Sequence, residues 1–182
     1  LFGANFFSEK KKLPLKITGT EFLRPIKYNE ELGSAQCKSA VMLAALKTAG
    51  ITKIKAKKSR NHTELLFRKL GVPIKIIKKA NYDFIEVKGK YNFKGFEYHV
   101  PGDISSSSFF IVLTLLSRNS SLTIKNVNIN NTRTGIIHIL NKMNAKILYK
   151  NKRKMNGELI SDILIKSRNR FKSINCPKKY NS

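Results

Sequence analysis

One pattern of strands and helices occurs twice along the 182-residue chain, and this repeat restricts the fold more than any other feature. Each copy has the order strand, helix, strand, helix, strand, strand over roughly seventy residues, which is the size of a supersecondary repeat. Gly33 aligns with Gly102 and Ile54 with Ile124, and segment 70–74 aligns with segment 143–147. Because strands alternate with helices, we predict an α/β fold in which helices pack on mixed sheets.

The spacing of apolar and turn-forming residues gives the expected elements of each copy. In the first copy we expect strands at 15–18 and within 22–29, helices at 34–48 and from 59 to 71, and strands at 51–56, 73–77 and 84–87. In the second copy we expect helices at 104–116 and from 131, strands at 96–100, 122–125, 146–149 and 160–165, and a polar turn at 151–156. The first helix of each copy is apolar on nearly every face, so it should lie at a domain centre, covered on both sides.

A polar helix start precedes the first of these apolar helices. Ser34 is a good N-cap, because its hydroxyl can accept a hydrogen bond from a free N–H of the first turn, and Gly33 lets the backbone bend sharply before it. The free N–H groups and the positive end of the helix dipole could bind an anion. From this stretch alone, an ordinary capped core helix is the simpler interpretation. Asp103 is expected to cap the corresponding helix of the second copy.

The net charge of +25 is compatible with nucleic-acid binding through phosphates. However, the lysines are scattered along the chain, and no recognition helix, RNP motif or zinc-finger spacing accompanies them. We therefore expect no nucleic-acid partner and interpret the charge as a lysine-rich surface whose positive potential steers small anions toward a cleft.

The remaining composition argues for a reduced, cytoplasmic protein without a metal or cofactor. Cys37 and Cys176 are far apart and lack metal-ligand spacing. No apolar run reaches the length of about twenty residues that a membrane span requires. The chain begins at Leu1 without Met or a signal peptide, so we expect a fragment.

Four segments in order carry a resemblance to a known family. They are Gly33–Ala40, Ser59–Glu64, Val100–Ser106 and Asn131–Gly135. Together they resemble the EPSP synthase (3-phosphoshikimate 1-carboxyvinyltransferase) family, which has the enolpyruvyl transferase fold, and the resemblance extends from about Leu13 to Ile165. It implies a monomeric enzyme of the shikimate pathway, and so of aromatic amino acid biosynthesis. In that family, two domains close over shikimate 3-phosphate and phosphoenolpyruvate. The carboxyvinyl group is then transferred to the 5-hydroxyl of shikimate 3-phosphate, and phosphate is released. Residues 1–100 would belong to the first domain, on the shikimate 3-phosphate side, and residues 101–182 to the second.

The resemblance also implies roles for individual residues. Ser34 and Ala35 match residues that hold the phosphate of shikimate 3-phosphate, although some members have a second Ser at the position of Ala35, so that contact would use the backbone only. Gln36 matches a glutamine that contacts both shikimate 3-phosphate and phosphoenolpyruvate. Arg60 matches an arginine that reaches the shikimate phosphate, and its forked guanidinium suits a phosphate better than lysine does. The other candidates are interpreted as structural residues: His62, His99, His138, Arg133 and Thr134.

The residues that would transfer protons are not expected in this chain. The family's Lys-Ser-Arg group and its acidic pair have no counterpart here, so the chain should hold no catalytic residue and be inactive alone. Two alternatives stay open at this point. One is the related UDP-N-acetylglucosamine carboxyvinyltransferase, which shares the fold and phosphoenolpyruvate, and the other is a basic RNA-binding repeat module.

Overall fold

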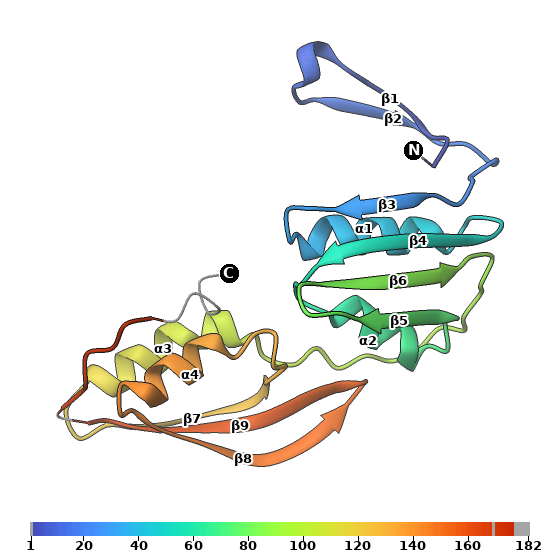
Figure 1. The fold of residues 1–182 in the computed structure, drawn as a ribbon. Helices are drawn as coiled ribbons and strands as arrows, with labels where there is room; N and C mark the ends of the chain where they lie inside the picture. The colour runs from blue at the N-terminus through green and yellow to red at the C-terminus, as the bar shows by residue number, and fades with distance from the viewer. Residues whose placement is uncertain (1, 169, 177–182) are drawn as a thin grey trace. The chain divides into compact units, whose positions relative to one another are not determined.

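The computed structural model describes residues 2–168 and 170–176, and the chain divides into two compact units, Leu1–Gly95 and Phe96–Ser182. We call these unit 1 and unit 2 and describe each by itself (Figure 1). From the family resemblance, a crossover between two domains was predicted near residues 100–102. That the two units belong to two different domains of a larger enzyme stays a prediction.

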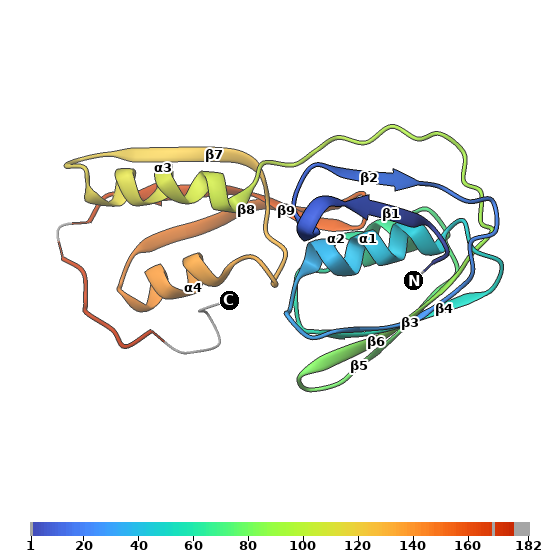
Figure 2. The same cartoon turned by 90° about the horizontal axis from the view of Figure 1, so that it is seen from above.

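Unit 1 is built on a four-stranded mixed sheet with helices on one face (Figures 1 and 2). Its strands are β3 (Lys27–Glu30), β4 (Ile51–Lys57), β5 (Ile74–Lys78) and β6 (Tyr82–Lys88), in the order β3-β4-β6-β5. β3 and β4 are parallel and connected through α1 (Ala35–Ala45), while the other pairs are antiparallel. Along β4 the buried Ile54 and Ala56 alternate with exposed lysines, so one face of the strand packs against the helices and the other faces solvent.

The second helix, α2 (His62–Lys69), completes the core of unit 1. Phe67 on α2 and Met42 on α1 are fully buried in one cluster with Ile54, Ile85 and Val87 of the sheet. The order β3-α1-β4-α2-β5-β6 is therefore the predicted repeat. An additional hairpin precedes it, formed by β1 (Asn5–Ser8), the short helix η1 (Glu9–Lys11) and β2 (Leu15–Thr18), of which only β2 was predicted.

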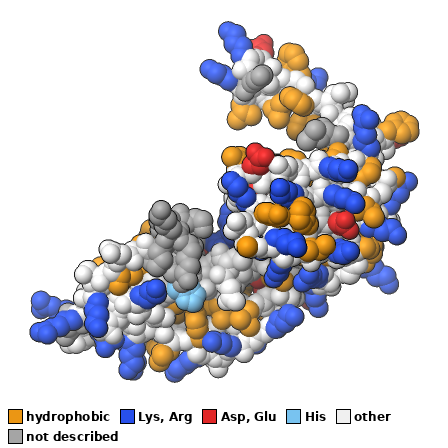
Figure 3. All heavy atoms as spheres, in the orientation of Figure 1, with side chains coloured by type: hydrophobic (Ala, Val, Ile, Leu, Met, Phe, Trp, Pro, Cys, Tyr) orange, Lys and Arg blue, Asp and Glu red, His pale blue; other side chains and the backbone are white. Residues whose placement is uncertain are grey.

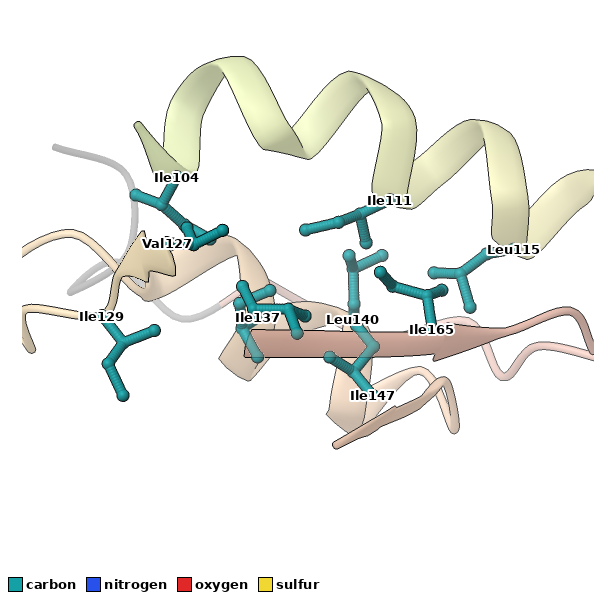
Figure 4. Packing of buried hydrophobic residues seen from close by; sticks show 10 residues of the cluster. Ile104, Ile111, Leu115, Val127, Ile129, Ile137, Leu140, Ile147 and Ile165 are labelled. Atoms are coloured by element: carbon teal, nitrogen blue, oxygen red, sulfur yellow. The ribbon is translucent and has the colours of Figure 1, made fainter. Parts of the chain in front are cut away.

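Unit 2 repeats the arrangement on a three-stranded antiparallel sheet. Its strands are β7 (Ser121–Asn128), β8 (Lys146–Met155) and β9 (Glu158–Lys166), in the order β7-β9-β8. The helices α3 (Ile104–Leu116) and α4 (Gly135–Lys142) lie on one face of this sheet. Figure 4 shows Ile104, Ile111 and Leu115 pointing from α3 toward Ile137, Leu140 and Ile165, with which they form the buried core.

The expected strand at 96–100 is wrong. Within the described residues, the first strand of the second copy is reduced to a single parallel bridge between Gly102 and Val127. The Gly102 N–H donates to the Asn126 carbonyl at 2.8 Å, and the Asn128 N–H donates to the Gly102 carbonyl at 2.9 Å. Residues 96–100 make no ladder with β7, so they connect to the bridge without forming a strand.

The expected polar turn at 151–156 is also wrong, because β8 continues to Met155. The polar residues of β8 pair with β9 through a register shift between Lys150 and Arg153. The turn that follows is Asn156–Gly157, with φ values of 52° and 85°. Two consecutive positive φ values are typical of the tight turns that join hairpin strands.

The two apolar helices are covered on one side only within the described residues. On α3, Phe109, Leu113 and Leu116 are 78%, 63% and 69% exposed, and Leu43 on α1 is 55% exposed. The expectation that both faces would be covered is therefore not met by this chain. No helix in the described ranges is long and apolar enough to cross a membrane.

Candidate anion site at the start of helix α1

A buried carboxylate shapes the loop between β3 and α1. Glu30, at the end of β3, is 2% exposed and accepts hydrogen bonds from the backbone N–H groups of Leu32, Gly33 and Ser34, each at 2.9 Å. Gly33 has a φ of +75°, a conformation that a residue with a side chain adopts only at a cost. Sequence reasoning missed Glu30, although a Glu four residues before an N-cap Ser was visible in the sequence.

The first turn of α1 presents unpaired donors. The Ser34 hydroxyl accepts from the Cys37 N–H at 3.2 Å, which confirms Ser34 as the N-cap. The N–H groups of Ala35 and Gln36 donate to no acceptor in the described part of the chain. Free N–H groups at the positive end of a helix dipole favour an anion.

The loop between β4 and α2, residues 58–61, lies beside this helix start. Lys38 Nζ, one turn into α1, donates to the Arg60 carbonyl oxygen at 2.8 Å. A Cβ atom added to Gly33 would lie 3.8 Å from the Lys58 carbonyl oxygen, so the two loops are neighbours. Arg60 is half-buried, and within the described ranges its guanidinium has no hydrogen-bond or ion-pair partner.

Ser34, Ala35, Gln36 and the backbone of Arg60 thus lie at one end of α1. That they bind a substrate stays a prediction. Of the three histidines, His62 is the first residue of α2, His99 is exposed in unit 2, and His138 lies on α4 with its Nε2 3.4 Å from the Thr134 hydroxyl. That all three are structural stays a prediction.

Unit 2 has an ion pair at the corresponding place. Asp103 caps α3 as predicted, and its carboxylate accepts from the Ser106 N–H at 3.0 Å. Arg133, in the loop before α4, donates from Nη2 to Asp103 Oδ1 at 2.6 Å and to the Ser105 hydroxyl at 2.6 Å. Burial raises the pKa of Asp103, but the N–H groups of Ser106 and Ser105 and the charge of Arg133 outweigh it and hold the pKa below its ordinary value.

The two copies differ in what faces the arginine. Ser34 and Asp103 each directly precede the first helix of their copy, and Arg60 and Arg133 each stand two residues before the second helix. In unit 2 the arginine meets a carboxylate that belongs to the chain. In unit 1 the cap is a neutral serine, so a negative group from solution could take the place of that carboxylate.

The repeated units, each with a capped apolar helix beside an arginine-bearing loop, define part of an enolpyruvyl transferase fold. The family model for EPSP synthase (3-phosphoshikimate 1-carboxyvinyltransferase) matches residues 2–177. The chain therefore belongs to the EPSP synthase family.

Relatives and solved structures agree with this assignment. The 3-phosphoshikimate 1-carboxyvinyltransferase of Petrotoga mobilis is 44% identical over 170 residues, which are 91% of this chain and 38% of the relative. The protein of the same name from Bartonella quintana is 40% identical and covers 92% of this chain and 38% of the relative. The EPSP synthase structure from Acinetobacter baumannii has a TM-score of 0.83 at 35% identity and covers 98% of this chain and 40% of that one. The chain thus spans about two fifths of the length of these proteins.

Proposed function

We propose that the chain is part of an enzyme that transfers the carboxyvinyl group of phosphoenolpyruvate to the 5-hydroxyl of shikimate 3-phosphate and releases phosphate. Unit 1 supplies the site for the phosphate of shikimate 3-phosphate. The observation that carries this proposal is the comparison of the two copies: Arg133 pairs with the carboxylate of Asp103, the cap of α3. In unit 1 the cap of α1 is the neutral Ser34, and the Arg60 guanidinium has no ion-pair partner among the described residues.

Each residue has a distinct part in this proposal. The Ser34 hydroxyl and the Ala35 N–H donate to the phosphate, and the Arg60 guanidinium pairs with it through a charge-assisted hydrogen bond. The amide of Gln36 has both donors and an acceptor, so it can donate to a phosphoenolpyruvate oxygen and accept from a ring hydroxyl of the other substrate.

Proton transfer to and from the vinyl carbon needs positioned acids or bases. We propose that these groups come from segments corresponding to the parts of the relatives that this chain does not match. We also propose a cytoplasmic monomer whose ligands are these two small anions, without a nucleic-acid or membrane partner. On the face shown in Figure 3, the Lys and Arg side chains are spread over both units rather than gathered into one patch, which supports small anions over nucleic acid.

Titration of the ¹⁵N-labelled chain with shikimate 3-phosphate tests the proposal. The amide resonances of Ala35 and Gln36 should shift on binding, and shikimate without its phosphate should cause no comparable change. Arg60→Gln should weaken binding about tenfold or more, because a hydrogen bond to a charged group contributes about 1.5–3 kcal/mol.

The control is Arg68→Gln, which removes the same charge from an exposed position in the last turn of α2. Its affinity should stay close to that of the unmodified chain. Equal losses in the two arginine variants, or shifts confined to unit 2, would contradict the proposed site. Titration with UDP-N-acetylglucosamine and with a short RNA tests the two alternative functions in the same spectra.

A further inference from the structure

Lys38 and Glu64 form a buried ion pair beside the proposed phosphate site. The Nζ of Lys38 on α1 lies 2.6 Å from Oε1 of Glu64 on α2, and their side chains are only 3% and 5% exposed. Among the residues whose burial is described, Lys38 is the one buried lysine of this lysine-rich chain. Burying two charges is costly, and an apolar pair of similar size often stabilises a protein as well or better. Stability alone is therefore a poor explanation for this pair.

The ammonium group also makes a contact that an apolar side chain could not make. Lys38 Nζ donates to the Arg60 carbonyl oxygen at 2.8 Å, so a single group joins α1, α2 and the loop between β4 and α2. Lys38 lies four residues after Ser34, on the same face of α1 as the N-cap. A second contact between α1 and α2 follows one residue later, where the hydroxyl oxygens of Ser39 and Thr63 are 2.6 Å apart and form a hydrogen bond.

The hydrogen-bonding capacity of this ion pair is not fully used. In a pair that served stability alone, we would expect every buried oxygen to accept a hydrogen bond. The second oxygen of Glu64, Oε2, is buried and accepts no hydrogen bond from the described residues. The Lys38 ammonium group is directed at Glu64 and the Arg60 carbonyl, and the described residues give it no contact with the Ser34 side chain.

We propose that Lys38, neutralised by Glu64, is a positioning residue that holds the Arg60 loop against the start of α1. It fixes the backbone from which the Arg60 guanidinium extends, so that the guanidinium and the Ser34 hydroxyl reach the same phosphate. This inference rests on the proposed function, because it concerns how that site is assembled.

The test replaces the ion pair with an apolar pair. Lys38→Met/Glu64→Leu removes both charges together and leaves no buried charge without a partner. Its resistance to urea should equal or exceed that of the unmodified chain, while its affinity for shikimate 3-phosphate falls about tenfold or more, the loss expected when Arg60 is no longer placed. Amide hydrogen exchange at 58–61 should accelerate while exchange in β4 stays slow.

A double-mutant cycle with Arg60→Gln separates positioning from direct contact. If Lys38 acts through Arg60, the apolar pair weakens binding no further in the Arg60→Gln background. A further, additive loss would overturn the inference, because it would mean that Lys38 contacts the phosphate itself. Unchanged affinity in a folded Lys38→Met/Glu64→Leu chain would overturn it as well.

A second variant keeps the test decisive if the apolar pair does not fold. Lys38→Gln/Glu64→Gln retains a neutral hydrogen-bonded pair but has a shorter side chain at position 38, which cannot span to the Arg60 carbonyl. It should show the same loss of affinity. Failure of Arg60→Gln to weaken binding, or absence of binding by the unmodified chain, would instead contradict the proposed function.

Discussion

The carboxylate of Glu30 shows how much of the candidate site depends on one buried residue. It accepts three backbone N–H groups and so fixes the approach to Ser34. Glu30→Gln keeps only one acceptor oxygen, so the chain should lose about 2 kcal/mol of unfolding free energy, the range for hydrogen bonds to a charged group. Urea denaturation followed by circular dichroism measures the loss. The matched control, Glu31→Gln, changes an exposed neighbour and should cost less than about 0.5 kcal/mol.

The Asp103 carboxylate should make the stability of unit 2 depend on pH in the acidic range. Its pKa is lower in the folded chain than the ordinary value of about 3.9, so it contributes stability that is present above that pH and is lost as pH falls through the folded pKa. Asp103→Asn keeps a capping oxygen but removes the charge. The difference in urea midpoint between the two chains should therefore shrink as pH falls from about 5 to 2. A difference that stays constant over this range would show that the charge of Asp103 is not responsible.

Among the helices, α3 has apolar residues both on a buried inner face and on an exposed outer face. Its inner face contributes Ile111, which is 0% exposed, and its outer face carries Phe109, Leu113 and Leu116. Changing these three to Gln should alter the unfolding free energy by less than about 0.5 kcal/mol each and raise solubility, because they contribute little to the core of unit 2. Ile111→Ala should cost about 2–5 kcal/mol. Comparable losses from both faces would mean that the outer face is covered in solution.

Sequence reasoning succeeded where the signal is local. The bounds of α3 were predicted because an N-cap Asp precedes a serine-rich first turn and a largely apolar stretch that ends at Leu116. It failed for β8, where the mainly polar residues 151–156 were interpreted as a turn although the strand continues to Met155. Pairing with β9 across a register shift keeps them in the strand. The local signal was the Asn156–Gly157 dipeptide, which is typical of a tight hairpin turn and places the turn after Met155.

In the candidate site, too, some residues could be predicted from local sequence signals and others could not. Ser34 follows from capping chemistry, but Arg60 was found through family resemblance alone. Lys38 was missed because a lysine in a chain of this charge is expected on the surface, and only the fold brings Glu64 and the Arg60 carbonyl to it.

For the molecule as a whole, we expect no catalysis by the 182-residue chain alone. It spans about two fifths of its relatives, and the proposed proton-transferring groups lie outside the match. A phosphate-release assay with shikimate 3-phosphate and phosphoenolpyruvate should give the background rate, while the full-length Petrotoga mobilis relative serves as the positive control. Measurable turnover by this chain would contradict the proposed division of the site.

Because of the Arg133–Asp103 pair in unit 2, the stability of the two copies should depend differently on the concentration of substrate. In unit 2 the chain carries its own counterion, so that loop is held whether or not substrate is present. In unit 1 the counterion would come from solution, and a ligand at a hundred times its Kd adds about 2.7 kcal/mol to folding stability. Shikimate 3-phosphate should therefore slow proteolysis of unit 1 and leave that of unit 2 unchanged, so that the lifetime of one copy follows the substrate concentration in the cell.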